Sequence, residues 1–82
     1  MRLDKYLKVS RIIKRRTVAN DACSAGKVEV NGKPVKPSYD VKPGDVLELH
    51  FGTRVIRAQV LSVAEHVRKE EAADMYKILS ET

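Results

Sequence analysis

The chain has 82 residues, which is enough for one domain with a small core, because a chain this short buries only about 60–65% of its unfolded surface. It carries 16 lysines and arginines against 11 acids, a formal net charge of +5. The excess is concentrated, since residues 1–36 hold ten cations and three acids whereas residues 37–82 hold six cations and eight acids. This asymmetry predicts a polyanionic partner on one face. The length of the chain leaves no room for a separate catalytic domain.

Several classes of site are not supported by the sequence. No apolar run is long enough for a spanning helix and the N-terminal residues lack a signal-peptide pattern, so we expect a cytoplasmic protein with no membrane partner. The lone Cys23 suggests a small core residue rather than a disulfide. His50 and His66 lack companion ligands, and no phosphate loop or nucleophile elbow is present. We therefore expect no metal, no cofactor and no enzymatic activity.

Residues 3–13 predict a first amphipathic helix. Five apolar residues fall on overlapping i, i+3 and i+4 positions, namely Leu3, Tyr6, Leu7, Val9 and Ile13, and cations occupy the other side. Tyr6 has two interpretations, a core residue or a platform for base stacking, and its neighbours Leu3 and Leu7 favour the core.

Residues 17–25 predict a second helix. Thr17 is the expected N-cap, Val18, Ala22 and Cys23 the expected apolar stripe, and Gly26 the left-handed stop. Four cations lie at or before this helix start, namely Arg11, Lys14, Arg15 and Arg16. Such a cluster is either a phosphate-binding site at a helix N-terminus or a solvated basic loop, and the charge run alone favours neither.

The remaining residues predict a small antiparallel sheet. Val28 and Val30 alternate in a half-buried strand before the Asn31-Gly32 hairpin turn. Pro34 and Pro37 lack amide donors, so the return segment should be irregular or an edge strand. A Pro-Gly turn at 42–45 leads to strands at 46–51 and 55–63, and residues 69–79 predict a third helix. The fold class is therefore α+β, with a domain at 1–64 and a helical tail at 65–82.

Four motifs carry a resemblance to a known family: RLDKYL at 2–7, RRT at 15–17, AGKVEVNGKPVKPS at 25–38 and VKPGDVLEL at 41–49. Over residues 1–51 the chain resembles the αL RNA-binding motif of small-subunit ribosomal protein S-four, which also occurs in pseudouridine synthases and tyrosyl-tRNA synthetases. The resemblance implies helices at 2–13 and 17–25 packed on a twisted sheet, with RNA across the helical face.

The tail sequence RKEEAADMYKIL narrows the resemblance to the RqcP family of bacterial ribosome-associated quality control factors. That family implies binding to obstructed large ribosomal subunits, through ribosomal RNA and peptidyl-tRNA, as a monomer working with the alanine-tailing factor RqcH. A related small heat-shock protein is the alternative within the motif, although its C-terminal tail is longer and basic. The resemblance places the RNA-binding residues at Arg2, Lys5, Lys8, Arg11, Lys14, Arg15, Arg16 and Thr17, with Lys27 and Lys33 peripheral.

Two functional hypotheses follow for this chain. The first is a non-catalytic RNA-binding factor that recognises RNA shape and phosphates, because base edges are hidden in the narrow major groove of RNA helices. The second is a protein-interaction adapter whose basic face meets an acidic partner protein. Salt titration of large-subunit binding, with and without ribonuclease, distinguishes them.

Overall fold

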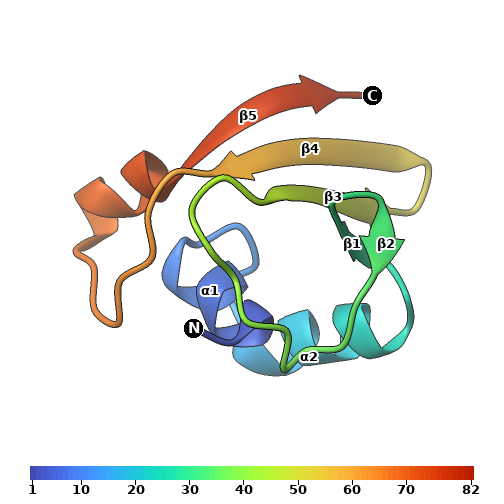
Figure 1. Ribbon diagram of the computed structural model, residues 1–82, viewed down its shortest axis with the longest axis horizontal. Coiled ribbons are helices and arrows are strands. Elements are labelled where there is room, and N and C mark those ends of the chain that lie inside the picture. The colour runs from blue at the N-terminus through green and yellow to red at the C-terminus, as the bar shows by residue number, and fades with distance from the viewer.

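Two short helices cover one face of a five-stranded antiparallel sheet in the computed structural model, which describes residues 1–82 (Figure 1). The strand order is β2-β1-β3-β4-β5, so β2 and β5 form the two edges. The predicted α+β class is confirmed. In chain order the elements are α1 (Leu3–Val9), α2 (Arg16–Ser24), β1 (Val28–Val30), β2 (Lys33–Pro34), β3 (Val46–Phe51), β4 (Arg54–Val60), the 3-10 helix η1 (Lys69–Met75) and β5 (Tyr76–Glu81).

One hydrophobic core lies between the helices and the sheet. Alternate residues of β1 and β3 point into it, because successive side chains on a strand face opposite sides. Its buried members are Leu3, Tyr6, Leu7, Ile13, Ala19, Cys23, Val28, Val30, Val41, Leu47, Leu49, Val60 and Met75. The N-terminal helices and the tail therefore share a single core.

The first helix is shorter than the predicted 3–13, because it ends at Val9. Arg11 follows with φ +62°, in the left-handed region that usually ends a helix with glycine. Its amide donates to the carbonyl of Lys8 at 3.1 Å, as in a glycine-type helix end. The prediction was wrong over residues 10–13 because this stop carries no glycine to mark it.

The second helix begins one residue before the predicted start. Arg15 occupies the N-cap position without a side-chain capping bond, so Thr17 lies within the first turn and is not the cap. Val18 is 48% exposed and does not belong to the core stripe, which is formed by Ala19 and Cys23. The buried side of α2 therefore includes Ala19 in place of Val18, together with the predicted Cys23.

The predicted turns and inner strands are confirmed. Asn31 and Gly32 both have positive φ, +52° and +85°, and close the β1–β2 hairpin in which Val30 pairs with Lys33. Pro34 lies on the edge strand as expected. The strand predicted at 55–63 ends at Val60, where the chain leaves the sheet.

The tail differs from the prediction in its second half. A short helix is present as η1, but Tyr76–Glu81 form β5 rather than further helix. These residues pair with β4, from Val60↔Tyr76 to Ile56↔Glu81, whereas a helix this short is only marginally stable by itself. The sequence-based division at residue 64 stays a prediction, while β5 extends the sheet started by the first part (Figure 1). None of the helices has the length and apolarity required to traverse a lipid bilayer.

Candidate nucleic-acid interface

Two arginines, one at the N-cap of α1 and one in the first turn of α2, converge on one buried carboxylate. Asp4, in the first turn of α1, is only 2% exposed. Arg2 donates to it twice at 3.2 Å, through Nε and Nη2, and Nη2 of Arg16 lies 3.6 Å from its Oδ1. Both guanidinium groups remain about half exposed. Asp4 therefore holds two cationic heads at the surface on the helical side of the molecule.

Further polar contacts complete this site. Asn20 of α2 donates to Asp4 Oδ2 at 3.2 Å, and the Lys5 amide donates to Oδ1 at 2.8 Å. Burial acts to raise the pKa of Asp4, but the hydrogen bonds from Arg2, Asn20 and the Lys5 amide, with the charge of Arg16, lower it below its ordinary value. Asp4 stays ionised and can orient its arginines near neutral pH.

Sequence reasoning missed Asp4 and Asn20 as parts of the site. The available signal was an acid two residues after Arg2 within a basic segment, although its burial could not be seen without the packing of α2 on α1.

The start of α2 forms a hollow beside this cluster. This hollow is open to solvent, has a volume of about 330 Å³ and is lined by Asp4, Arg16, Thr17, Asn20 and Asp21. No side chain caps the helix here, so its first amides are free to bind a phosphate oxygen. A phosphate site and a solvated basic loop both stay predictions for this helix start, and the uncapped helix end with Arg16 beside it fits the first of them.

Three other predicted cations gather at a second hollow. Lys8 from α1 and Arg11 and Lys14 from the loop line a space of about 290 Å³. All three side chains belong to exposed residues. Lys5, from the same helix, instead forms an ion pair with Glu65 of the tail.

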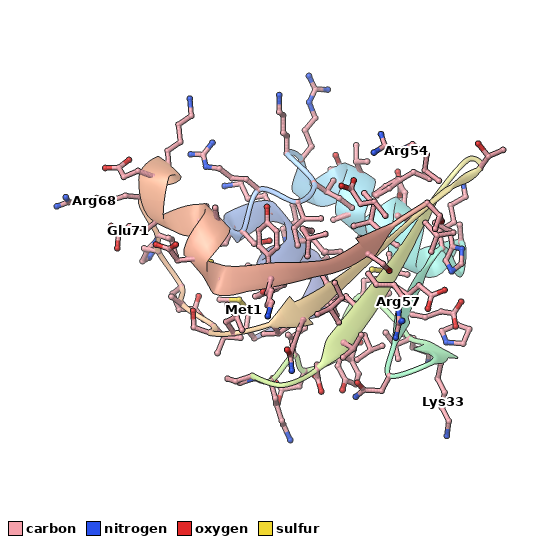
Figure 2. All side chains as sticks on the ribbon, turned by 90° about the horizontal axis from the view of Figure 1, so that it is seen from above. Met1, Lys33, Arg54, Arg57, Arg68 and Glu71 are labelled. Carbon is pink, nitrogen blue, oxygen red and sulfur yellow. The ribbon has the colours of Figure 1, made fainter.

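The remaining predicted contacts are scattered. Arg15 is exposed at the N-cap of α2, and Lys27 lies beside an apolar hollow that includes Val18 and Phe51. Lys33 projects from the β1–β2 hairpin, at the opposite end of the molecule from Arg68 (Figure 2). Lys33 also lines none of the three hollows that contain other predicted RNA-binding residues.

Tyr6 and Cys23 are core residues. The Tyr6 ring is fully buried, and burial raises the pKa of its phenol, with a smaller contribution from Tyr76. The stacking interpretation of Tyr6 is therefore wrong. Burial, with a smaller effect of Asp4, raises the pKa of Cys23 to about 11, which keeps the thiol protonated and unreactive at neutral pH.

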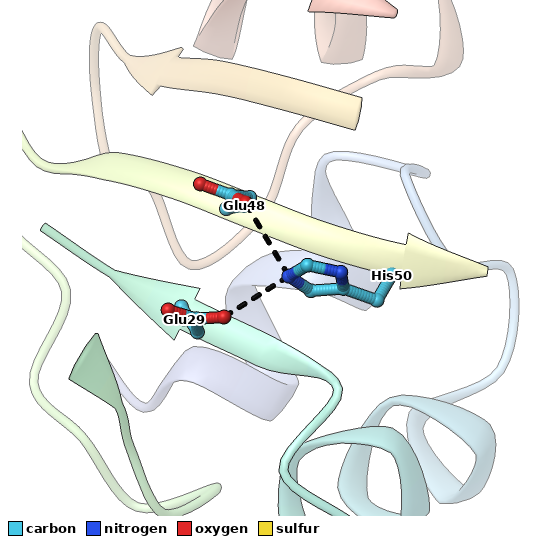
Figure 3. A group of neighbouring side chains, drawn as sticks. All are labelled: Glu29, Glu48 and His50. Atoms are coloured by element: carbon cyan, nitrogen blue, oxygen red, sulfur yellow. Dashed lines mark hydrogen bonds and ion pairs between the residues drawn. The ribbon is translucent and has the colours of Figure 1, made fainter. Parts of the chain in front are cut away.

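The outer face of the sheet carries a separate polar cluster (Figure 3). His50 Nε2 lies 3.0 Å from Glu29 Oε2 and 3.4 Å from Glu48 Oε1. These three residues are the group that could hold a metal ion. Their proximity follows from strand register, since Glu29 pairs with Glu48 and His50 is two residues further on β3. The expectation of no metal site stays a prediction.

Comparison with known proteins assigns the family. The S4 domain model matches residues 1–47. The RQC P-site tRNA stabilizing factor of Bacillus subtilis is 52% identical over 99% of this chain and 94% of its own length. The chain belongs to the RqcP family of S4 domain proteins. The Streptococcus pneumoniae protein of the same name is also 52% identical, over the whole chain and 93% of its own length.

The RqcP family assignment agrees with a structural match to a related protein. Heat Shock Protein 15 of Vibrio cholerae, solved as a trimer, superposes with a TM-score of 0.89 at 31% identity over 98% of this chain and 82% of its own. The S4 match of this RqcP family member includes α1, α2 and the Asp4 cluster, whereas the tail lies outside it.

Proposed function

We propose that this chain is a non-catalytic RNA-binding factor of the cytoplasm that binds obstructed large ribosomal subunits and stabilises their peptidyl-tRNA. Ribosomal RNA and the tRNA are its ligands, and it supports alanine tailing of stalled chains together with an RqcH-like factor. The relatives named RQC P-site tRNA stabilizing factor support this proposal over nearly the full length of the chain.

The observation that carries the proposal is the convergence of Arg2 and Arg16 on Asp4. Guanidinium groups bind phosphates through paired hydrogen bonds, and fixing them beforehand reduces the entropy lost on binding. The uncapped start of α2 lies next to them and adds backbone donors. Such a surface reads phosphate positions and RNA shape rather than base sequence.

The mode of action follows from this surface. A binding protein shifts a conformational equilibrium only by its differential affinity for the two states. Contacts made to the tRNA as well as to the subunit would favour the state in which the tRNA is held. A tenfold preference corresponds to about 1.4 kcal/mol, which one added charge-assisted hydrogen bond supplies.

The test compares the affinity of the chain for vacant and for peptidyl-tRNA-loaded large subunits at one salt concentration. We expect tighter binding to the loaded subunits, and a loss of orders of magnitude in affinity between about 50 and 200 mM salt. Equal affinities, together with normal alanine tails in cells lacking the protein, would contradict the proposal. Binding that survives ribonuclease and varies little with salt would favour the adapter function instead.

A heat-shock-type factor is the second candidate, and the match to Heat Shock Protein 15 favours it. Both functions require large-subunit binding, so binding does not distinguish them, and the effect of losing the protein in cells does. Loss of alanine tailing indicates the first function, whereas normal tailing with accumulation of chain-bearing large subunits indicates the second. We expect the protein to act as a monomer, which sedimentation in the absence of subunits tests.

A further inference from the structure

The tail forms one wall of the hollow that contains Lys8. On one side of its roughly 290 Å³ lie Lys8 and Val9 of α1 with Arg11 and Lys14 of the loop, and on the other lie Glu65, His66 and Val67. The second wall is outside the residues matched by the S4 domain model. The hollow thus joins the basic loop to a segment that the family motif does not contain.

The charge in this hollow is unbalanced. Lys8, Arg11 and Lys14 take part in no ion pair, so their charges face the hollow or solvent uncompensated. Glu65 is the single acid of the lining, and its carboxylate is paired with Lys5. An anion entering the hollow therefore meets three free cations and one neutralised acid.

Both walls are held in place by the fold. Val67 packs against the hydrophobic core, and the Lys5–Glu65 ion pair ties the tail to α1. On the opposite wall, Arg11 has a left-handed backbone, with its amide bonded to the Lys8 carbonyl. Non-glycine residues adopt this conformation at a cost, and such strain is concentrated at functional sites.

We propose that this hollow binds a backbone phosphate of RNA between the basic loop and His66. Lys8, Arg11 and Lys14 supply positive charge, and the imidazole N–H of His66 donates a hydrogen bond from the tail. The hollow is at the small end of ligand pockets and is lined by three cations that take part in no ion pair, which favours a phosphate group. The inference rests on the proposed function and adds the tail to the RNA-binding surface.

A double-variant cycle on purified peptidyl-tRNA-loaded large subunits tests this site. At one salt concentration, His66→Ala is expected to weaken binding about three- to tenfold, the loss of one hydrogen bond to a charged group near the surface. If His66 and Lys14 contact the same phosphate, the double variant with Lys14→Ala loses less affinity than the product of the two single losses. His66→Gln keeps an N–H donor and should recover part of the affinity.

His50→Ala is the matched control, because its ring lies against Glu29 and Glu48 on the outer face of the sheet (Figure 3). It should bind like the wild-type chain. If His66→Ala binds with wild-type affinity while Arg16→Ala binds more weakly, the proposed phosphate site in the hollow is overturned and the proposed function stands. If the two single losses multiply in the double variant, His66 and Lys14 do not contact the same phosphate, and the proposed site is likewise overturned. A wild-type chain that fails to bind loaded subunits would overturn the proposed function itself.

Discussion

The hydroxyl of Tyr6 donates a 2.8 Å hydrogen bond to the main-chain carbonyl of Met75, joining the first helix to the tail across 69 positions of sequence. Both residues are buried in the common core. The same carbonyl also accepts the amide of Leu61 at 2.8 Å. The tail is therefore fixed to α1 at the point where η1 ends and β5 begins.

Tyr6→Phe should lower the free energy of unfolding by about 1 kcal/mol, the net value of one buried hydrogen bond. The loss stays modest because the Met75 carbonyl keeps its bond from Leu61. Urea unfolding measures it. Tyr76→Phe, which removes a hydroxyl from a partly exposed ring, is the control and should change the value by less than about 0.5 kcal/mol.

Arg16→Ala should weaken binding to loaded large subunits at least about tenfold, because a charge-assisted contact is lost. Its ion pair with Asp4 is half exposed, so stability should change by no more than about 1 kcal/mol. Arg54→Ala, which removes an exposed arginine paired with Glu81, is the matched control and should keep its affinity. Parallel losses of melting temperature and affinity in Arg16→Ala would assign the residue to the fold instead.

Arg11→Gly should weaken binding while leaving stability equal or higher. Glycine accepts the φ of +62° without the penalty of a Cβ, and this gain of roughly 1–2 kcal/mol exceeds the entropy cost of glycine, about 0.5–1 kcal/mol. Thermal unfolding and subunit affinity are measured on the same preparation. A variant that loses stability would show that the arginine side chain supports the fold.

Ionised Asp4 should stabilise the folded protein near neutral pH, and this stabilisation should be lost in acid. Its folded-state pKa lies below the ordinary value, so its contribution is fully present above about pH 5 and is lost as the pH falls through about 4 and below. The difference in unfolding free energy between wild type and Asp4→Asn should be constant from pH 7 to 5 and shrink by pH 3. Asn20→Ala removes one donor to Asp4 and should shift the loss to higher pH. A difference independent of pH would contradict this role.

Cys23 should resist alkylation in the folded protein. Its side chain is 3% exposed and burial raises its pKa to about 11, so little thiolate is available at pH 8. Iodoacetamide should modify it at a rate set by unfolding, and as fast as a free cysteine in urea. Rapid modification without denaturant would indicate that α2 opens locally at its C-terminal turn.

The signals that could be read from sequence were local. Asn31-Gly32 and Gly26 each need a positive φ that glycine and asparagine adopt easily, so the hairpin and the end of the second helix were predicted correctly. Val28 and Val30 alternate, which identifies a half-buried strand without reference to its partners. The charge of residues 1–36 likewise depends on composition alone.

Tertiary structure decided the features that depend on distant partners. Residues 76–79 have helical spacing, but hydrogen bonding to the free edge of β4 makes them a strand. Asp4 acts as the centre of the arginine cluster only because α2 brings Arg16 and Asn20 to it and excludes water. His66 reaches the basic loop because Val67 and Lys5 hold the tail against the first helix. The sequence by itself determined which residues are charged, apolar or free to turn, whereas burial and long-range pairing, which exist only in the packed chain, decided which of them meet.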